Sequence, residues 1–386
     1  MQRLGDIAKI TAGQAAPKDF SINGYPFIRA GHLDELLLGK KLDELPKVSI
    51  DVANKSGLKL IPKGTILFAK SGMSATKNRV YITDSDSYFV SHLAGILPSH
   101  KFVNSFLARY LSWYNMSNLI LDSAYPSIRL EDINNLQIPL PPLEQQKKIA
   151  AILDAADAYR QLTKSLIAKY DELTQSLFLD MFGDPVINPK QLPIKLLEEI
   201  CEEIIDCPHS TPNYVNHISE FPCIRTTELD NGTINWSKMK YLDHQGYIER
   251  TKRLTPQEGD IIYGREGSFG EAAIVPSDCK MSLGQRVMLF RPNLDYVNSK
   301  FLHAVVRSNW VYKQALKVTS GSTVGHINVK DIKKFKIIVA PINLQNQFAK
   351  YVQDIEEQKA QAQSSLEKAE ELFASLLQKS FKGLLG

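Results

Sequence analysis

Two short segments of the sequence place glycine turns beside side chains that can bind a nucleic acid. They are KSGMSATKNR, residues 70–79, and GREGSFG, residues 264–270. Glycine lets a backbone approach a phosphate closely, and arginine can donate two hydrogen bonds to a guanine edge. The candidate DNA-binding residues in these segments are Lys70, Ser71, Lys77, Arg79, Arg265 and Ser268.

Two small polar loops offer similar groups. They are DSAYPSIRL, residues 122–130, and VTSGSTVGHIN, residues 318–328. Any of their polar residues can instead cap a turn. Arg29 and Arg225, outside these loops, are further candidates, and both can instead form structural ion pairs. The additional candidates are Tyr125, Ser127, Arg129, Ser322, Thr323 and His326 from the loops, with Arg29 and Arg225.

Catalytic motifs are missing from the sequence. Its one Pro-Pro pair, Pro141–Pro142, lies between leucines and not in the Asn/Asp-Pro-Pro-aromatic motif of a base methyltransferase. No G-x-x-x-x-G-K-[ST] loop for ATP occurs. We therefore expect a non-catalytic chain that holds no cofactor of its own.

The four cysteines, Cys201, Cys207, Cys223 and Cys279, show no C-x-x-C spacing. A zinc site built from Cys201, Cys207 and His209 is one interpretation of them. The irregular spacing favours reduced, structural thiols and no metal.

Length and composition indicate an ordinary globular protein. The chain has 386 residues, 44% of them apolar, which is enough for two or three domains with their own cores. No apolar run of eighteen residues occurs, and the N-terminal MQRLGDIAKITAG lacks the apolar stretch of a signal peptide. We expect a cytoplasmic protein.

The sequence repeats itself at an offset of about 196 residues. YPFIRAGHLD (25–34) matches FPCIRTTELD (221–230), and PKGTILFAKSG (62–72) matches QEGDIIYGREG (257–267). IRLEDINNLQIPLPPLEQQ (128–146) matches INVKDIKKFKIIVAPINLQ (327–345). Each copy combines short β-rich runs with segments of helical spacing, so each should be a mixed α and β domain.

A long helix should follow each globular copy. Leu143 to Phe182 contains no proline or glycine, directly after three prolines in four positions, and Ile342 to Lys382 repeats the pattern. The predicted organisation is a globular domain at 1–142, a helix at 143–182, a second globular domain at 183–341 and a helix at 342–386. The fold class is α+β.

Heptads counted from Ile149 and from Phe348 predict one apolar seam on each helix. A narrow seam buries little alone, so the two helices should pair with each other as an antiparallel coiled coil about a pseudo-twofold axis. The alternative is that each helix packs on its own globular domain. The predicted seam residues are Ile149, Ile152, Ala156, Tyr159, Leu166, Tyr170, Leu173 and Leu177, with Phe348, Tyr351, Ile355, Ala362, Ala369, Leu372 and Leu376.

Charge is distributed unevenly between globular domains and helices. Residues 1–142 carry 16 basic and 12 acidic side chains, and residues 186–342 carry 20 and 17. The segments 143–185 and 343–386 carry 5 basic against 7 acidic and 5 against 6. This pattern is typical of a protein whose globular domains contact a polyanion.

Several segments of the sequence resemble a known family. IRLEDINNLQIPLPPLEQQKKIAAIL and YDELTQSLFLDMFGDP resemble the central region of the DNA-specificity subunit of type I restriction-modification systems. HINVKDIKKFKIIVAPINLQNQFAKYV resembles its C-terminal region, and EGDIIYGREGSFGEAAIV resembles its target recognition domains. The likeness covers nearly the whole chain.

The resemblance implies a non-catalytic subunit that binds a bipartite double-stranded DNA sequence, with one half-site per recognition domain and the helices as spacer. It implies two adenine-N6 methyltransferase subunits and restriction-translocase subunits as partners, which would hold S-adenosylmethionine, ATP and Mg. Two other interpretations stay open. One is a stand-alone regulator with two half-site readers, and the other is a coiled-coil adaptor that does not bind DNA.

Overall fold

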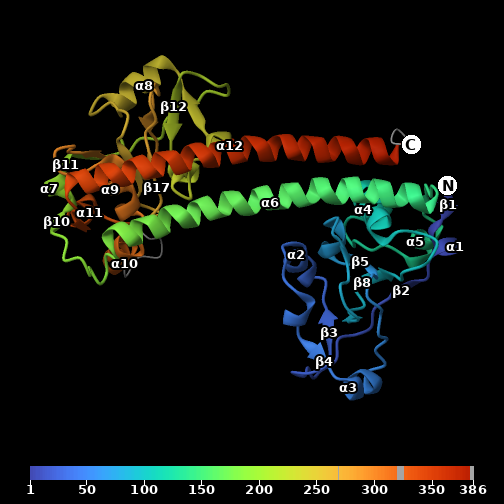
Figure 1. The fold of residues 1–386 in the computed structure, drawn as a ribbon. Coiled ribbons are helices and arrows are strands. Elements are labelled where there is room, and N and C mark those ends of the chain that lie inside the picture. Colours follow the sequence, from blue (N-terminus) through green and yellow to red (C-terminus); the bar gives the residue numbers. More distant parts are fainter. Residues whose placement is uncertain (268, 320–325, 383–386) are drawn as a thin grey trace. The chain divides into compact units, whose positions relative to one another are not determined.

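The computed structural model describes residues 1–267, 269–319 and 326–382 (Figure 1). Its contacts divide the chain into two units, Met1–Lys164 with Gln363–Gly386 and Ser165–Ala362. Each unit contains one strand-containing domain, which we call the first domain (residues 1–142) or the second domain (residues 183–341). Each unit also contains part of both long helices. One part of each helix therefore packs with the first domain and the other part with the second domain.

The first domain contains two small sheets and a two-stranded ribbon (Figure 1). The larger sheet is antiparallel in the order β2 (Ile10–Ala12), β8 (Leu93–Ile96), β5 (Ile66–Ala69), β6 (Val80–Ile82). The smaller has the order β4 (Lys47–Val48), β3 (Tyr25–Ile28), β7 (Tyr88–Phe89), with β3 and β7 parallel. The ribbon pairs β1 (Gln2–Arg3) with β9 (Gln137–Ile138).

The second domain repeats this topology strand for strand. Its larger sheet has the order β11 (Cys201–Asp206), β19 (Val287–Pro292), β16 (Ile261–Gly264), β17 (Ala272–Ile274). Its smaller sheet has the order β15 (Lys240–Leu242), β12 (Phe221–Ile224), β18 (Ser282–Leu283). Its ribbon pairs β10 (Ile194–Leu196) with β20 (Lys336–Ile338), and it adds the hairpin β13 (Leu229–Asp230) and β14 (Thr233–Ile234).

Short helices cover the sheets of both domains. The first domain has α1 (Leu4–Ile7), α2 (His32–Leu37), α3 (Ile50–Lys55), α4 (Asn104–Tyr114) and α5 (Leu130–Asn135). The second has α7 (Leu197–Ile200), α8 (His244–Thr251), α9 (Ser299–Val306), α10 (Asn309–Thr319) and α11 (Val329–Lys333). The long helices are α6 (Leu143–Phe182) and α12 (Ile342–Phe381).

The two long helices are antiparallel in each unit taken separately. In the first unit, Arg160 lies over the Phe373 ring and Lys164 pairs with Glu370, at 2.8 Å. In the second unit, Asp171 pairs with Lys359 and Phe178 packs on Phe348, with ring centroids 5.8 Å apart. In both units, residue numbers fall along α12 as they rise along α6, which defines an antiparallel pair.

Each domain completes its core with both helices. Ile149 and Leu153 of α6 share a buried cluster with Phe106 of α4 and with Phe373 and Phe381 of α12. In the second unit the corresponding cluster joins Phe178, Phe182 and Phe348 to Phe301 of α9. Packing between the helices and packing on a domain, which the sequence presented as alternatives, therefore occur together.

The predicted heptad register is wrong by one position of the seam. Residues at the predicted d positions are exposed on the outer face of the helices, with exposed fractions of 41–56% for Ile152, Tyr159, Leu166, Leu173, Tyr351 and Leu372. The predicted a positions are buried or half-buried, among them Ile149, Phe348, Ala362 and Ala369, and the other covered positions lie four residues after them, such as Leu153 and Val352. The heptad therefore begins three residues earlier, at Gln146 and Gln345.

A buried glutamine connects the start of each long helix to its domain through hydrogen bonds. Gln146 accepts a hydrogen bond from the Val103 backbone N–H at 2.9 Å and donates to the Pro141 carbonyl at 2.8 Å. Gln345 accepts from Asn298 N–H at 2.9 Å and donates to the carbonyls of Ala340 and Tyr296. Both glutamines are at most 1% exposed. Because they are polar, a search for apolar heptad positions does not identify them as seam residues.

Candidate nucleic-acid interface

The two candidate DNA-binding loops of each domain lie against each other. In the first domain an isolated β-bridge joins Ser71 to Ser127, and the Ile128 N–H donates to the Lys70 carbonyl at 2.7 Å. In the second domain a bridge joins Glu266 to His326, and Ile327 N–H donates to the Arg265 carbonyl at 3.1 Å. We call these the first and second loop clusters.

The second loop cluster contains a chain of charged and polar side chains. The Arg265 Nε lies 2.8 Å from Asp206 Oδ1, and its Nη1 donates toward the His326 ring at 3.1 Å. His326 lies 3.5 Å from Glu266, whose other oxygen is 3.2 Å from Arg286 Nε. Arg265 is only 6% exposed, so its guanidinium faces its neighbours more than solvent.

Arg286 marks the exposed end of this chain. It lies in the short connection between β18 and β19, where the backbone passes from one sheet to the other. Its φ is 67°, a left-handed conformation that a side chain other than glycine rarely adopts. Such a conformation costs of order 1 kcal/mol and persists where the surroundings demand it, often at functional positions.

The first loop cluster has the same backbone plan with different side chains. Arg79 is 8% exposed and its guanidinium lies 2.6 Å from Asp34. Ser71 Oγ is 2.8 Å from the Nδ1 of His92. His92 precedes β8 as Arg286 precedes β19, and Lys70 N–H donates to the His92 carbonyl as Arg265 N–H donates to that of Arg286. His92 and Arg286 are thus equivalent positions.

The other predicted residues fall into three groups. Lys77, Tyr125, Ser127 and Arg129 are exposed at the first cluster, with Lys70 and Ser71 half-buried. Arg29 lies over the Phe20 ring and Arg225 pairs with the buried Glu228, a carboxylate that raises the pKa of Arg225. Ser268, Ser322 and Thr323 lie outside the described residues.

Sequence reasoning missed five residues of the clusters: Asp34, His92, Asp206, Glu266 and Arg286. Glu266 directly follows Arg265, so it could have been noticed as an acid in the loop, whereas Asp206, at the end of β11, is far from both loops in the sequence. His92 and Arg286 occur in VSHLAGIL and GQRVMLF, segments with little identity. Only strand pairing reveals that these two segments are equivalent.

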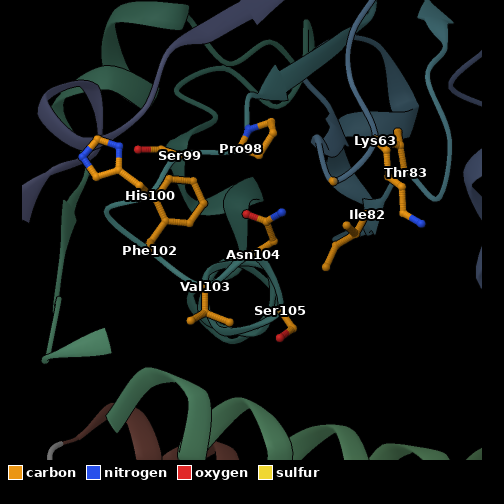
Figure 2. A pocket seen from close by; sticks show the side chains of 11 residues that line it. Lys63, Ile82, Thr83, Pro98, Ser99, His100, Phe102, Val103, Asn104 and Ser105 are labelled. Atoms are coloured by element: carbon orange, nitrogen blue, oxygen red, sulfur yellow. The ribbon is translucent and has the colours of Figure 1, made fainter. Parts of the chain in front are cut away.

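A separate hollow of the first domain lies at the N-terminal end of α4. Its volume is about 740 Å³, and Asn104 lies between His100 on one side and Ile82 and Lys63 on the other (Figure 2). The first backbone N–H of this turn, that of Val103, is already satisfied by Gln146. The residues that line the hollow do not include any of the first loop cluster.

The thiols and acids of the described chain form no metal site. No group of three or more His, Cys, Asp or Glu among these residues is placed to hold a metal ion. The four cysteines are free, and burial raises the pKa of the Cys201 thiol to about 12. Within the same residues, no helix is both long and apolar enough to cross a membrane.

Comparisons with known proteins agree on one family. The model of the type I restriction modification DNA specificity domain matches residues 1–170 and 217–370. The specificity subunit of the type I restriction enzyme MjaVIII from Methanocaldococcus jannaschii is 23% identical, over 97% of this chain and 91% of the relative. That of EcoKI from Escherichia coli K12 is 23% identical, over 86% of this chain and 76% of the relative.

Solved structures share the fold. The S subunit of a type I restriction-modification system from M. genitalium aligns with a TM-score of 0.60 and 16% identity, over 98% of this chain and 95% of the other. A chain from a study of complex assembly in a type I restriction-modification system aligns with a TM-score of 0.54 and 18% identity, over 99% and 97%. Two copies of one recognition domain fit the reading of a two-part DNA target. The chain belongs to the family of type I restriction-modification DNA specificity domains.

Proposed function

We propose that this chain is the non-catalytic subunit that selects the DNA sequence for a type I restriction-modification complex. The observation that carries the proposal is the match of both repeats to the DNA specificity domain. Each repeat also brings its two glycine-containing or polar loops together through a β-bridge. The first domain would read one half-site and the second domain the other, and the complex would methylate adenine N6.

Within each cluster, the buried arginines and the exposed side chains would have different roles. Arg265 and Arg79 are held by Asp206 and Asp34, so they would position the loops. Base edges would be read by exposed donors and acceptors, since each good bidentate contact discriminates by ~1–3 kcal/mol. In the second domain the exposed end of the ion-pair chain is Arg286.

The exposed apolar stripe on α6 would bind a methyltransferase subunit. Ile152, Tyr159, Leu166 and Leu173 recur every seven residues, and each is 41–54% exposed. Residues at this spacing share one face of a helix, and large apolar patches on a protein surface mark interaction sites. Two methyltransferase subunits, and restriction-translocase subunits for cleavage, would hold S-adenosylmethionine, ATP and Mg, so this chain would need none.

Co-expression with the methyltransferase tests the proposal. The chain alone should transfer no methyl group, and with its partner it should direct methylation to one sequence. Methyl transfer by the rigorously purified chain would contradict a non-catalytic role. Tight binding of the chain alone to a unique site, with no effect on methylation, would favour a stand-alone regulator instead.

A further inference from the structure

The second domain presents a dense group of lysines that the reading of bases does not explain. We call this group the lysine face: Lys313 and Lys317 of α10, Lys330 and Lys333 of α11, Lys334, and Lys336 of β20. Lys333 is half-buried and the other five are exposed. Asp331 is the acidic residue within the same stretch of α11 and β20.

Hydrogen bonds bring the elements of the lysine face together. The Gln314 side chain of α10 accepts from the Lys336 N–H at 2.8 Å and donates to the Lys336 carbonyl at 3.0 Å. Lys313 and Lys317 are four residues apart on α10, so they lie on one face of that helix. Lys330, Lys333 and Lys334 are related in the same way along and just beyond α11.

The first domain has no such face at the equivalent positions. Residues 131, 134, 135 and 137 of α5 and β9 correspond to 330, 333, 334 and 336 at the 199-residue offset, and strand pairing supports that alignment. There the first domain has one glutamate, two asparagines and one glutamine, with a charge of −1 against +4. Its segment 110–128 contains no lysine or arginine at all.

Within the described part of the chain, three members of the lysine face lack the ion-pair partners that other lysines have. Lys280 pairs with Glu220 and Lys359 with Asp171. Among the ion pairs between described residues, none involves Lys330, Lys334 or Lys336. Like charges at this helical spacing repel each other, and an anionic partner would relieve that repulsion.

Residue type and place indicate what that partner is. Lysine is a flexible point charge, whereas arginine is the usual choice for bidentate recognition of base edges or carboxylates. Lys330 follows His326, a member of the second loop cluster, by four residues, so this end of the face adjoins that cluster along the chain. We propose that the lysine face binds the DNA phosphate backbone beside the half-site of the second domain, and does so independently of sequence.

This inference rests on the proposed function, and it adds an asymmetry between the two domains. The second domain would supply more of the salt-dependent affinity than the first. Each neutralised phosphate contributes roughly 0.9 to the slope of log affinity against log salt concentration. Four lysines would therefore contribute up to about 3.6 to that slope.

The experiment measures this slope for the complex of the chain with its methyltransferase on its own methylation site, by fluorescence anisotropy from about 50 to 200 mM salt. Changing four lysines of the face, all between residues 330 and 336, to glutamine should lower the slope by about 1 to 3.6 and leave the methylated sequence unchanged. Changing them to arginine should keep the slope. The substitutions are Lys330→Gln, Lys333→Gln, Lys334→Gln and Lys336→Gln.

A matched control removes the same charge from lysines that are in ion pairs: Lys40→Gln, Lys147→Gln, Lys280→Gln and Lys359→Gln. If the slope falls no further in the test variant than in this control, the inference is wrong. Loss of methyltransferase binding in the test variant but not in the control would identify a protein partner and would also overturn the inference. If the quadruple variant folds poorly, the single variants Lys330→Gln and Lys334→Gln provide the test, and each should lower the slope by up to about 0.9.

The wild-type complex separates the two proposals. If it binds its site without salt dependence, or has no site, the proposed function fails. If the wild-type complex has a steep slope and the lysine variants have the same slope, the inference fails and the proposed function stands.

Discussion

Substituting Arg265 separates a residue that positions a loop from one that reads DNA. Arg265→Met keeps most of the side-chain volume and leaves Asp206 without its 2.8 Å partner. Arg265 and Asp206 have side-chain exposures of 7% and 14%. Removing one partner of a buried ion pair costs about 3–5 kcal/mol, because the remaining charge is uncompensated. We expect a loss of unfolding free energy in that range, with the lower end set by the partial exposure of Asp206.

Arg286→Met is the matched control for this substitution. The Arg286 side chain is 59% exposed, and its ion pair with Glu266 is partly solvated. Exposed pairs contribute about 0–1 kcal/mol. We therefore expect Arg286→Met to leave the unfolding free energy within about 1 kcal/mol of wild type, yet to change the sequence that is methylated in one half-site.

Tryptophan fluorescence during urea unfolding provides the assay. Trp236 and Trp310 lie in the second unit and Trp113 in the first, so a Trp113→Phe background reports on the second unit. Asp206→Asn should change the unfolding free energy and the methylated sequence in the same way as Arg265→Met does. If Arg265→Met instead costs less than about 1 kcal/mol and alters the methylated sequence while Asp206→Asn does not, Arg265 reads DNA directly and the reasoning is refuted.

Three further predictions follow from the long helices. Tyr159→Glu should lower the yield of methyltransferase that co-purifies with the chain while its thermal unfolding stays unchanged; equal yields would exclude the apolar stripe as the docking surface. Gln345→Met should lower the unfolding free energy by about 1–3 kcal/mol, because it leaves a buried N–H unsatisfied, whereas the exposed Gln347→Met should change it little; similar effects of both would contradict the role of the buried glutamine. Seven residues inserted after Thr174 and after Phe373 keep the heptad register and add ~10 Å of helix; an active variant should methylate half-sites roughly three base pairs further apart, and retention of the original spacing would show that the helices do not set it.

Much of the fold follows from the sequence because the chain contains the same unit twice. The repeated proline-to-helix junctions predict two helices that begin at Leu143 and Ile342, and α6 and α12 have these starts. The heptad period is also visible in the sequence. Its register is not, because Ile152, Tyr159, Leu166 and Leu173 are as apolar as the residues that are buried. Which apolar stripe faces inward depends on the domain surface that receives it.

The candidate interface was only partly accessible from sequence. Glycine and polar side chains mark the loops, and the structure brings both loops of each domain together. Burial and ion pairing cannot be read from the chain, so Arg265 and Arg79 resemble exposed base readers until Asp206 and Asp34 are placed beside them. His92 and Arg286 escape a search for repeats because their surroundings have diverged while the strand pairing has not.

The most direct test of two independent readers is a genome-wide map of N6-methyladenine in cells that express the chain with its methyltransferase. We predict one two-part sequence with an unspecified gap. Arg286→Met should change only one part of it, and His92→Ala should change only the other. A single continuous sequence, or a change of both parts by either substitution, would contradict it.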